Sequence, residues 1–279
     1  MGGWLAEVSG RRYPGGMGPA HPDLIYDVGV CNGDDSAYYL HKGYRVVGVE
    51  ANPLLLEPLR RRFAAEIRDG CYELLGFGID AEPGEAPFWV CDDHPEWSSF
   101  DRSIASRNGA RHHCVEVPTC RFASLLGRFG RGAYCKIDIE GNDELCLQDM
   151  TDATAPQFVS VELMDAQRQI RRMQELGYTR FKIISQRTLR PPGTGMAGLK
   201  ARLPRPLRSL VVSGEARLFR HKADGSWTFP LGSSGPFGED TPGKWQSAEH
   251  SLELGRLVGS DLSDWYDIHA ARCPASEAG

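Results

Sequence analysis

Apolar and polar positions along the first two thirds of the chain form blocks of two kinds, which alternate. The first kind is a short apolar run, such as "LIYDV" at 24–28, which predicts a buried strand. The second has apolar residues four apart, such as Leu55, Leu59 and Phe63, which predict an amphipathic helix. Because the two kinds alternate, we expect a Rossmann-like α/β fold with a mostly parallel sheet and helices on both faces.

The strands and helices can be assigned along the chain from these blocks. The predicted strands are 24–28, 45–50, 71–80, 86–91, 114–120, 133–141, 157–164 and 180–186. The predicted helices are 34–40, 53–67, 121–129, 142–150 and 165–178. A Pro-Gly turn before 86–91 indicates that this strand lies in a hairpin with the preceding strand. The polar, aperiodic stretch 92–113 is predicted to be a loop over a site.

The composition changes at residue 187. Basic residues without any acid follow in the segment 187–208, at Arg187, Arg190, Lys200, Arg202, Arg205 and Arg208. We divide the chain into an N-terminal lead (1–20), an α/β core (21–186), a basic, loop-rich insertion (187–213) and a C-terminal extension (214–279). The extension is expected to hold a final strand at 214–221 and, further on, a helix before the closing stretch 264–270.

Charge and composition exclude several classes of protein. A net charge of −5 and a pI near 5.9 argue against general nucleic-acid binding. Apolar runs stay short of the roughly 18 residues that a membrane helix needs, and the first residues lack a signal-peptide pattern, so a cytoplasmic protein is expected. The eight cysteines form no C-x-x-C pair, which favours buried reduced thiols over zinc ligands or disulfides.

The turn after the first strand carries the first chemical signal. A dinucleotide-binding pattern G-x-G-x-x-G would require glycine at 29, 31 and 34, where the chain has Gly29, Cys31 and Asp34. The acids Asp34 and Asp35 occupy the helix start that would otherwise attract a pyrophosphate. The ligand at this turn is therefore expected to lack phosphate.

An acid at the end of the second strand narrows the choice of ligand. Glu50 follows Asp27 by 23 positions, where a carboxylate can accept hydrogen bonds from both hydroxyls of a ribose. A ligand with a ribose, no phosphate and a positive centre satisfies these features. S-adenosylmethionine fits, because its sulfonium is cationic and its ammonium group favours nearby carboxylates such as Asp27 and Asp34. The other interpretation of Glu50 is an exposed acid at a strand end.

Four stretches together resemble the FkbM-type methyltransferase family. They are "DVGVCNGDDSAYYL", "VVGVEANP", "VPTCRFASLL" and, most specific, "CKIDIEGNDELCL". The resemblance covers about 24–186 and implies a class I methyltransferase fold that uses S-adenosylmethionine and methylates hydroxyls, as on macrolides or sugars. The chain departs from the family at Phe122 and Ala123, where a leucine and an aspartate are usual.

The positions of the motifs specify a candidate cofactor site. Ser98 and Ser99 match a serine-containing stretch of the family, and Ile79 and Asp80 lie where an adenine would stack and bond. The expected cofactor-binding residues are Asp27, Gly29, Asn32, Gly33, Asp34, Ser36, Glu50, Ala51, Asn52, Ile79, Asp80, Ser98, Ser99 and Asp138.

Three acids are candidates for catalysis. Asp138 and Glu140 share one face of an apolar strand with Lys136, and Glu162 ends the next strand in the core. They could supply a general base for an alcohol acceptor, or they could bind a divalent cation that lowers the pKa of the alcohol. A third interpretation is that the lysine and carboxylates only brace the strand. His112, His113 and His269 are expected to be solvated surface groups rather than bases.

These features favour an S-adenosylmethionine-dependent O-methyltransferase acting on a small molecule or saccharide. The alternatives are a non-catalytic methyltransferase-like binding module, which exposed and unpaired acids at 136–140 would favour, and a nicotinamide oxidoreductase, which Asp34 and the failed glycine pattern disfavour. The basic segment either recruits an anionic acceptor or is a solvated loop.

Overall fold

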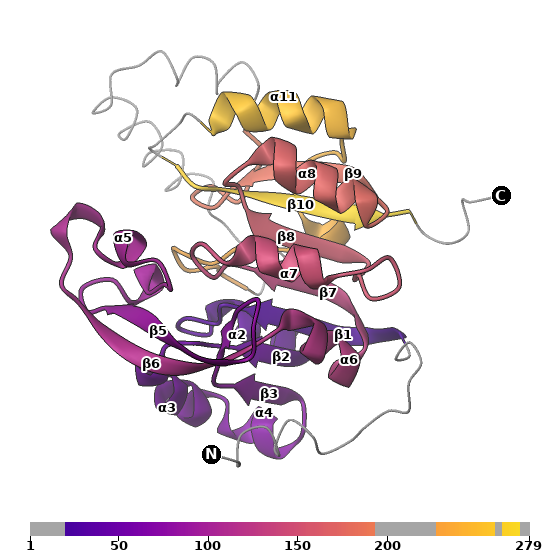
Figure 1. Ribbon diagram of the computed structural model, residues 1–279. Coiled ribbons are helices and arrows are strands. Elements are labelled where there is room, and N and C mark those ends of the chain that lie inside the picture. Colours follow the sequence, from indigo (N-terminus) through magenta and orange to yellow (C-terminus); the bar gives the residue numbers. More distant parts are fainter. Residues whose placement is uncertain (1–19, 193–226, 260–263, 274–279) are drawn as a thin grey trace.

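The computed structural model describes residues 20–192, 227–259 and 264–273, and these form a mixed α/β fold around a seven-stranded sheet (Figure 1). The strand order is β3-β2-β1-β7-β8-β10-β9, and only β10 runs antiparallel to its neighbours. The strands are β1 (Ala20–Val28), β2 (Arg45–Val49), β3 (Tyr72–Leu75), β7 (Arg131–Ile137), β8 (Phe158–Glu162), β9 (Tyr178–Ser185) and β10 (Tyr266–Arg272). The predicted mostly parallel α/β fold is confirmed.

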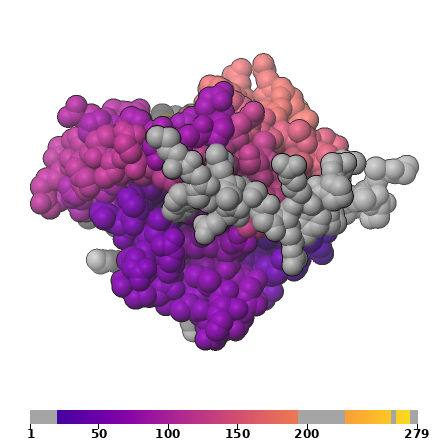
Figure 2. Space-filling view, turned by 60° about the horizontal axis from the view of Figure 1, so that its bottom comes forward, coloured from indigo at the N-terminus to yellow at the C-terminus, as the bar shows by residue number. Residues whose placement is uncertain are grey.

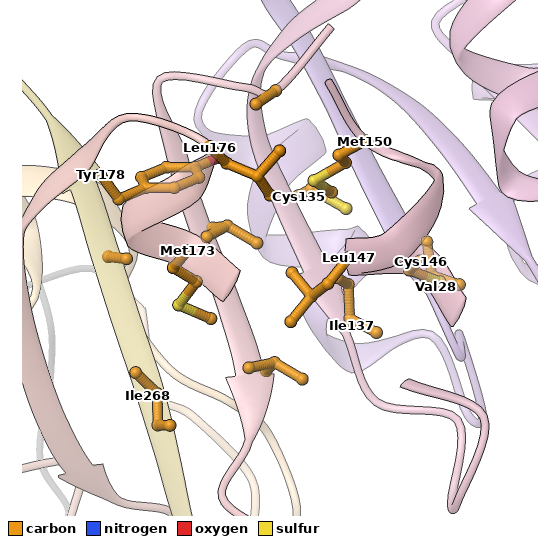
Figure 3. Packing of buried hydrophobic residues seen from close by; sticks show 14 of the residues in the cluster. Val28, Cys135, Ile137, Cys146, Leu147, Met150, Met173, Leu176, Tyr178 and Ile268 are labelled. Carbon is orange, nitrogen blue, oxygen red and sulfur yellow. The ribbon is translucent and has the colours of Figure 1, made fainter. Parts of the chain in front are cut away.

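Helices cover both faces of the sheet, as the apolar runs in its strands require. One face packs against α6 (Phe122–Phe129), α7 (Asp143–Asp149), α8 (Ala166–Glu175) and α11 (Ala248–Val258). Figure 3 shows this core, in which Leu147 of α7 and Met173 of α8 lie over Ile137 and Ile268 of the sheet. The other face packs against α2 (Asp34–His41) and α3 (Pro53–Arg62), with α4 (Ala64–Arg68) following.

Helix boundaries follow local chemistry. The Asn52 side chain accepts from Leu54 N, and Pro53 occupies the first turn of α3. The predicted helix 53–67 is divided at Phe63, whose backbone leaves the helical region and whose buried ring packs on Tyr72. At the start of α6, where Ala123 stands, the Ala123 amide donates to Asp149 Oδ2 of α7 at 3.0 Å.

The predicted strand 71–80 and its hairpin are wrong in detail. The segment divides into β3 in the main sheet and β4 (Gly78–Ile79), which pairs with β6 (His112–Cys120) in a second, three-stranded sheet. Strand β5 (Gly84–Cys91) pairs antiparallel with β6 and is not adjacent to β4. The paired strands β5 and β6 share a small core of Phe88, Val90 and Val117. No local sequence pattern specifies that β5 pairs with β6 rather than with β4.

The segment between β5 and β6 is more ordered than the predicted loop. It contains η1 (Pro95–Trp97), α5 (Arg102–Ala105) and η2 (Arg107–Gly109), and the predicted loop residues His112 and His113 belong to β6. With β5 and β6 it forms an arm, residues 84–120, that projects from the main sheet in Figure 1 and as the magenta lobe in Figure 2.

The C-terminal part of the chain contributes to the central sheet. Strand β10 inserts between β8 and β9, and residues 227–237 pack on α2, where the Phe229 and Tyr38 rings lie 4.6 Å apart. The short helix η3 (Gly238–Asp240) follows. The expected strand 214–221 and the basic residues Lys200, Arg202, Arg205 and Arg208 lie outside the described residues. The division of the chain into four parts stays a proposal.

Two further expectations meet mixed outcomes. All eight cysteines lie within the described residues as free thiols, but only Cys91, Cys135 and Cys146 are buried, while Cys71, Cys114 and Cys273 are exposed. His269 is not a surface group, because it lies buried in β10, where burial lowers its pKa to about 3. No helix among the described residues is long and apolar enough to span a membrane.

The turn after β1 depends on glycine for space. A Cβ on Gly29, whose φ is +90°, would lie 1.7 Å from the carbonyl oxygen of Asp138. Gly43 has a similar φ of +85°, but nothing lies within 4 Å of its Cβ position. Gly43→Ala should lower the free energy of unfolding by about 1–2 kcal/mol through backbone strain. Gly29→Ala should lower it clearly more, because the added Cβ also meets the Asp138 carbonyl oxygen. Urea denaturation measures both losses. Equal losses of unfolding free energy would contradict the close approach.

Candidate functional site

A cavity of about 520 Å³ opens at the carboxyl ends of β1, β2, β7 and β8. Open α/β sheets bind ligands at this edge. Ten of the predicted site residues line it: Gly29, Asn32, Asp34, Glu50, Ala51, Ile79, Ser98, Asp138, Glu140 and Glu162. Six others do not, namely Asp27, Gly33, Ser36, Asn52, Asp80 and Ser99.

Lys136 is the centre of a buried charge network beneath the cavity. Its Nζ donates to the carbonyl oxygen of Gly29 at 2.7 Å and lies 3.4 to 3.8 Å from carboxylate oxygens of Asp27, Asp35 and Asp138. Burial disfavours the ammonium charge, but these three carboxylates outweigh burial and hold the pKa of Lys136 well above its ordinary value. The charges at 136–140 are therefore paired rather than free in solvent.

Asp27 acts inside this network rather than at the cavity surface. Its side chain is fully buried and accepts a hydrogen bond from Ser36 Oγ at 2.6 Å. Burial raises the pKa of Asp27 to about 6, although Lys136 opposes that rise. Both Asp27 and Ser36 thus join β1 to α2 and support the turn above them.

The two acids that open α2 have different partners. Asp34 lines the cavity and pairs with Arg62 of α3, with Oδ1 and Nη1 2.9 Å apart. Asp35 is buried and accepts hydrogen bonds from Ser233 Oγ and, at 3.1 Å, from Ser234 N. The second acid therefore fastens a segment nearly 200 residues later to the start of α2.

Glu50 lies at the end of β2 with its carboxylate fixed by the backbone. Oε2 accepts from Cys31 N at 2.8 Å and Oε1 from Asn52 N at 2.7 Å. Burial raises the pKa of Glu50 to about 7, although both amides oppose this. Because each carboxylate oxygen has a second lone pair, Glu50 can still accept hydrogen bonds from a ligand in the cavity.

The wall beyond Glu50 is more aromatic than the sequence suggested. Ile79 is joined there by Phe77, which lies between β3 and β4, and by Phe88 and Phe100 of the arm. Asp80 points elsewhere, because its Oδ1 accepts from the amide of Ala81. The sequence does not reveal that these rings meet, because their meeting depends on the pairing of β6 with both β4 and β5.

The two serines of the arm divide their roles. Ser98 lines the cavity, and its Oγ accepts from Cys91 N at 3.1 Å. Ser99 is buried outside the lining, and its Oγ donates to the carbonyl oxygen of Glu140 at 2.6 Å. Glu140, which this bond ties to the arm, has a φ of +52°, an unusual backbone conformation for a residue other than glycine.

Carboxyl groups gather where β7 and β8 end and β10 begins. Burial, followed by the charges of Asp138 and Glu140, raises the pKa of Glu162 to about 9. Burial and Asp138 raise that of Glu140 to about 7, while Arg107, 2.9 Å from its Oε2, opposes the rise. Asp267, opposite Glu162 in β10, has its pKa raised by burial to about 8. At neutral pH the structure thus keeps Glu162 protonated.

Several lining residues were not among the predicted site residues, although the stretch 92–113 and the basic segment from Arg187 were expected near the site. Gln186, Arg187, Leu231, Ser233 and Trp265 come from the last third of the chain. The arm adds His94 and Trp97, whose rings stack 4.0 Å apart. The alternation in "YDIHAAR" could have indicated β10, and with it Trp265, but no pattern indicated its position in the sheet. Among the described residues, no group of three or more His, Cys, Asp or Glu side chains is arranged to hold a metal ion.

Two similar solved structures are both phosphoethanolamine N-methyltransferase 2 of Haemonchus contortus. One, in complex with phosphomonomethylethanolamine and S-adenosylhomocysteine, has 7% identity and a TM-score of 0.38, with 97% of this chain and 52% of that chain covered. The other, in complex with S-adenosyl-L-methionine, has 8% identity and a TM-score of 0.37, with 97% and 51% covered.

The chain spans about half the length of those two structures. No curated protein gives a significant match to it. The family model for the methyltransferase FkbM domain matches residues 27–180, more than half of the 279 residues. The chain therefore belongs to the FkbM methyltransferase family, whose methyl donor is S-adenosylmethionine.

Proposed function

We propose that this protein transfers a methyl group from S-adenosylmethionine to a hydroxyl of a small molecule or saccharide. The observation that carries the proposal is a single cavity whose lining includes both Glu50 with Gly29 of the glycine turn and the acids Asp138, Glu140 and Glu162. A donor bound at Glu50 and an acceptor bound at the acids would lie side by side over the same strand ends. Alignment of this kind supplies much of the rate enhancement in a displacement reaction.

The residues around Glu50 fit the cofactor. Glu50 would accept the ribose hydroxyls, because two backbone amides already fix the orientation of its carboxylate. Ile79 and the neighbouring phenyl rings would hold the adenine, and Gly29 leaves space at the turn. Some of the other predicted cofactor residues line the cavity and could contact the cofactor directly. Others, such as Asp27 and Ser36, bond to each other and stabilise the glycine turn.

The protonation states divide the work among the acids. Bound S-adenosylmethionine supplies an electrophilic methyl group. Asp138, on the cavity side of Lys136, would take the proton from the acceptor hydroxyl. Glu162, protonated at neutral pH, would donate a hydrogen bond that orients the acceptor, and Arg107 stabilises the charged form of Glu140.

The alternatives have less support. A non-catalytic module would have exposed, unpaired acids at 136–140, but Lys136 is buried and Glu140 pairs with Arg107. A nicotinamide enzyme would need room for phosphates at the start of α2, where Asp34 lies beside Asn32 in the lining. Titration calorimetry with S-adenosylhomocysteine and NADH separates the methyltransferase from the oxidoreductase.

Cofactor binding should depend on Glu50. Glu50→Ala removes hydrogen bonds to a charged acceptor and should weaken S-adenosylmethionine binding by about 1.5–3 kcal/mol. Calorimetry measures the affinity, and circular dichroism checks that the fold is kept. Glu57→Ala, which removes an exposed acid of α3, is the matched control and should bind normally. Equal affinities of the two variants would remove Glu50 from the ribose site.

Turnover should separate the roles of Asp138 and Glu162. Asp138→Asn removes the proposed base and should lower kcat by roughly 10²–10⁴. Glu162→Gln keeps a hydrogen-bond donor in place of the protonated acid, so its kcat at pH 7 should fall far less than that of Glu162→Leu. Equal kcat for the two Glu162 variants would exclude the orienting role.

Chelation tests the divalent-cation alternative. Activity that survives prolonged treatment with EDTA would exclude it.

Stability should depend on pH through Glu162. Its folded-state pKa of about 9 lies above the value of an exposed glutamate, so the folded state binds more protons than the unfolded state between those values. The stabilisation is fully present at acidic pH and is lost as pH rises towards 9. Glu162→Gln should therefore show a smaller fall in Tm between pH 6 and pH 9 than the wild type. An unchanged slope would show that Glu162 does not retain its proton in the folded state.

A further inference from the structure

The cavity has one wall that lies beyond the family domain. The family match ends at residue 180, but Gln186, Arg187, Leu231, Gly232, Ser233 and Trp265 also line the cavity. We call Leu231, Gly232, Ser233 and Trp265 the C-terminal wall. Glu162 lines the same cavity at the end of β8, which is paired to β10 just after Trp265.

Two side chains of the C-terminal wall are apolar and exposed. Five large hydrophobic side chains are exposed among the described residues, and only Leu231, at 72%, and Trp265, at 46%, line the cavity. Neither side chain gains much from burial in the fold, so their apolar surface stays available to a ligand. Trp265 also carries the guanidinium of Arg187 4.8 Å from its ring centroid.

Both parts of the wall are fixed in place. On one side of Leu231, the ring of Phe229 packs on Tyr38; on the other, Ser233 and Ser234 bond to Asp35. Trp265 is held by its carbonyl oxygen, which accepts from Gln186 N at 2.8 Å. A wall anchored at several points is preorganised, and preorganisation lowers the entropy cost of binding.

We infer that the C-terminal wall binds the methyl acceptor, and that the acceptor has an apolar ring face beside the hydroxyl that is methylated. This inference rests on the proposed function. The ring would lie against Leu231 and Trp265, and the hydroxyl would reach Glu162 and Asp138. Specificity for the acceptor is thus set by residues outside the family domain, while the domain itself binds the cofactor.

Binding of a simple probe tests this subsite. The probe is benzyl alcohol, which has one ring face and one hydroxyl, and the open-chain polyol sorbitol is the control compound. Dissociation constants are measured by ligand-observed NMR titration with S-adenosylhomocysteine at saturation. Leu231→Ser and Trp265→Ala should each weaken benzyl alcohol binding about tenfold, and Trp265→Phe should restore most of it.

Matched variants separate the possible outcomes. Leu54→Ser changes another exposed leucine that does not line the cavity, and it should leave benzyl alcohol binding unchanged. All variants should keep wild-type affinity for S-adenosylhomocysteine by calorimetry. If the cofactor product binds but benzyl alcohol does not, or binds equally to Leu231→Ser and Leu54→Ser, the subsite is wrong while the proposed function stands. If S-adenosylhomocysteine itself fails to bind the wild type, both are wrong.

Discussion

The structure of the site depends on the buried ammonium group of Lys136. It joins the end of β1 through Asp27, the start of α2 through Asp35, the glycine turn through its backbone and the end of β7 through Asp138. A buried charge without partners would destabilise the fold by several kcal/mol. Because one cation serves three carboxylates, the four segments must lie at fixed positions around it. The cavity floor between Gly29 and Asp138 is therefore held at several points.

The same network connects the family domain to the rest of the chain. Asp35 faces Lys136 with one oxygen and bonds Ser233 and Ser234 with its carboxylate. The wall that contains Leu231 is thereby coupled to the floor that contains Asp138. Carboxyl groups also gather at the end of β8 and the start of β10. There, burial raises the pKa values of Glu162 and Asp267, so these two acids keep their protons to higher pH. Raised pKa values of this kind are common at reacting sites.

The arm formed by β5, β6 and the helices between them adds a third constraint. Ser99 and Arg107 both act on Glu140, one through its backbone and the other through its side chain. Phe100 from the same arm fills the space beside Gly78, where a Cβ would lie 2.3 Å from the ring. The arm therefore closes the end of the cavity that Ile79 lines and contacts the strand end that carries the candidate acids.

The sequence by itself determined how strands and helices alternate along the core, where the glycine turn lies and which acids end the strands. Each of these features depends on local periodicity or spacing. Gly29, Glu50, Asp138 and Glu162 were identified in this way and all line one cavity. Only the tertiary structure decided that β4 leaves the main sheet, that β10 enters it and that Leu231 and Trp265 reach the cavity. Strand partners and buried charge pairs join residues far apart in the chain, and no local pattern specifies which distant groups will meet.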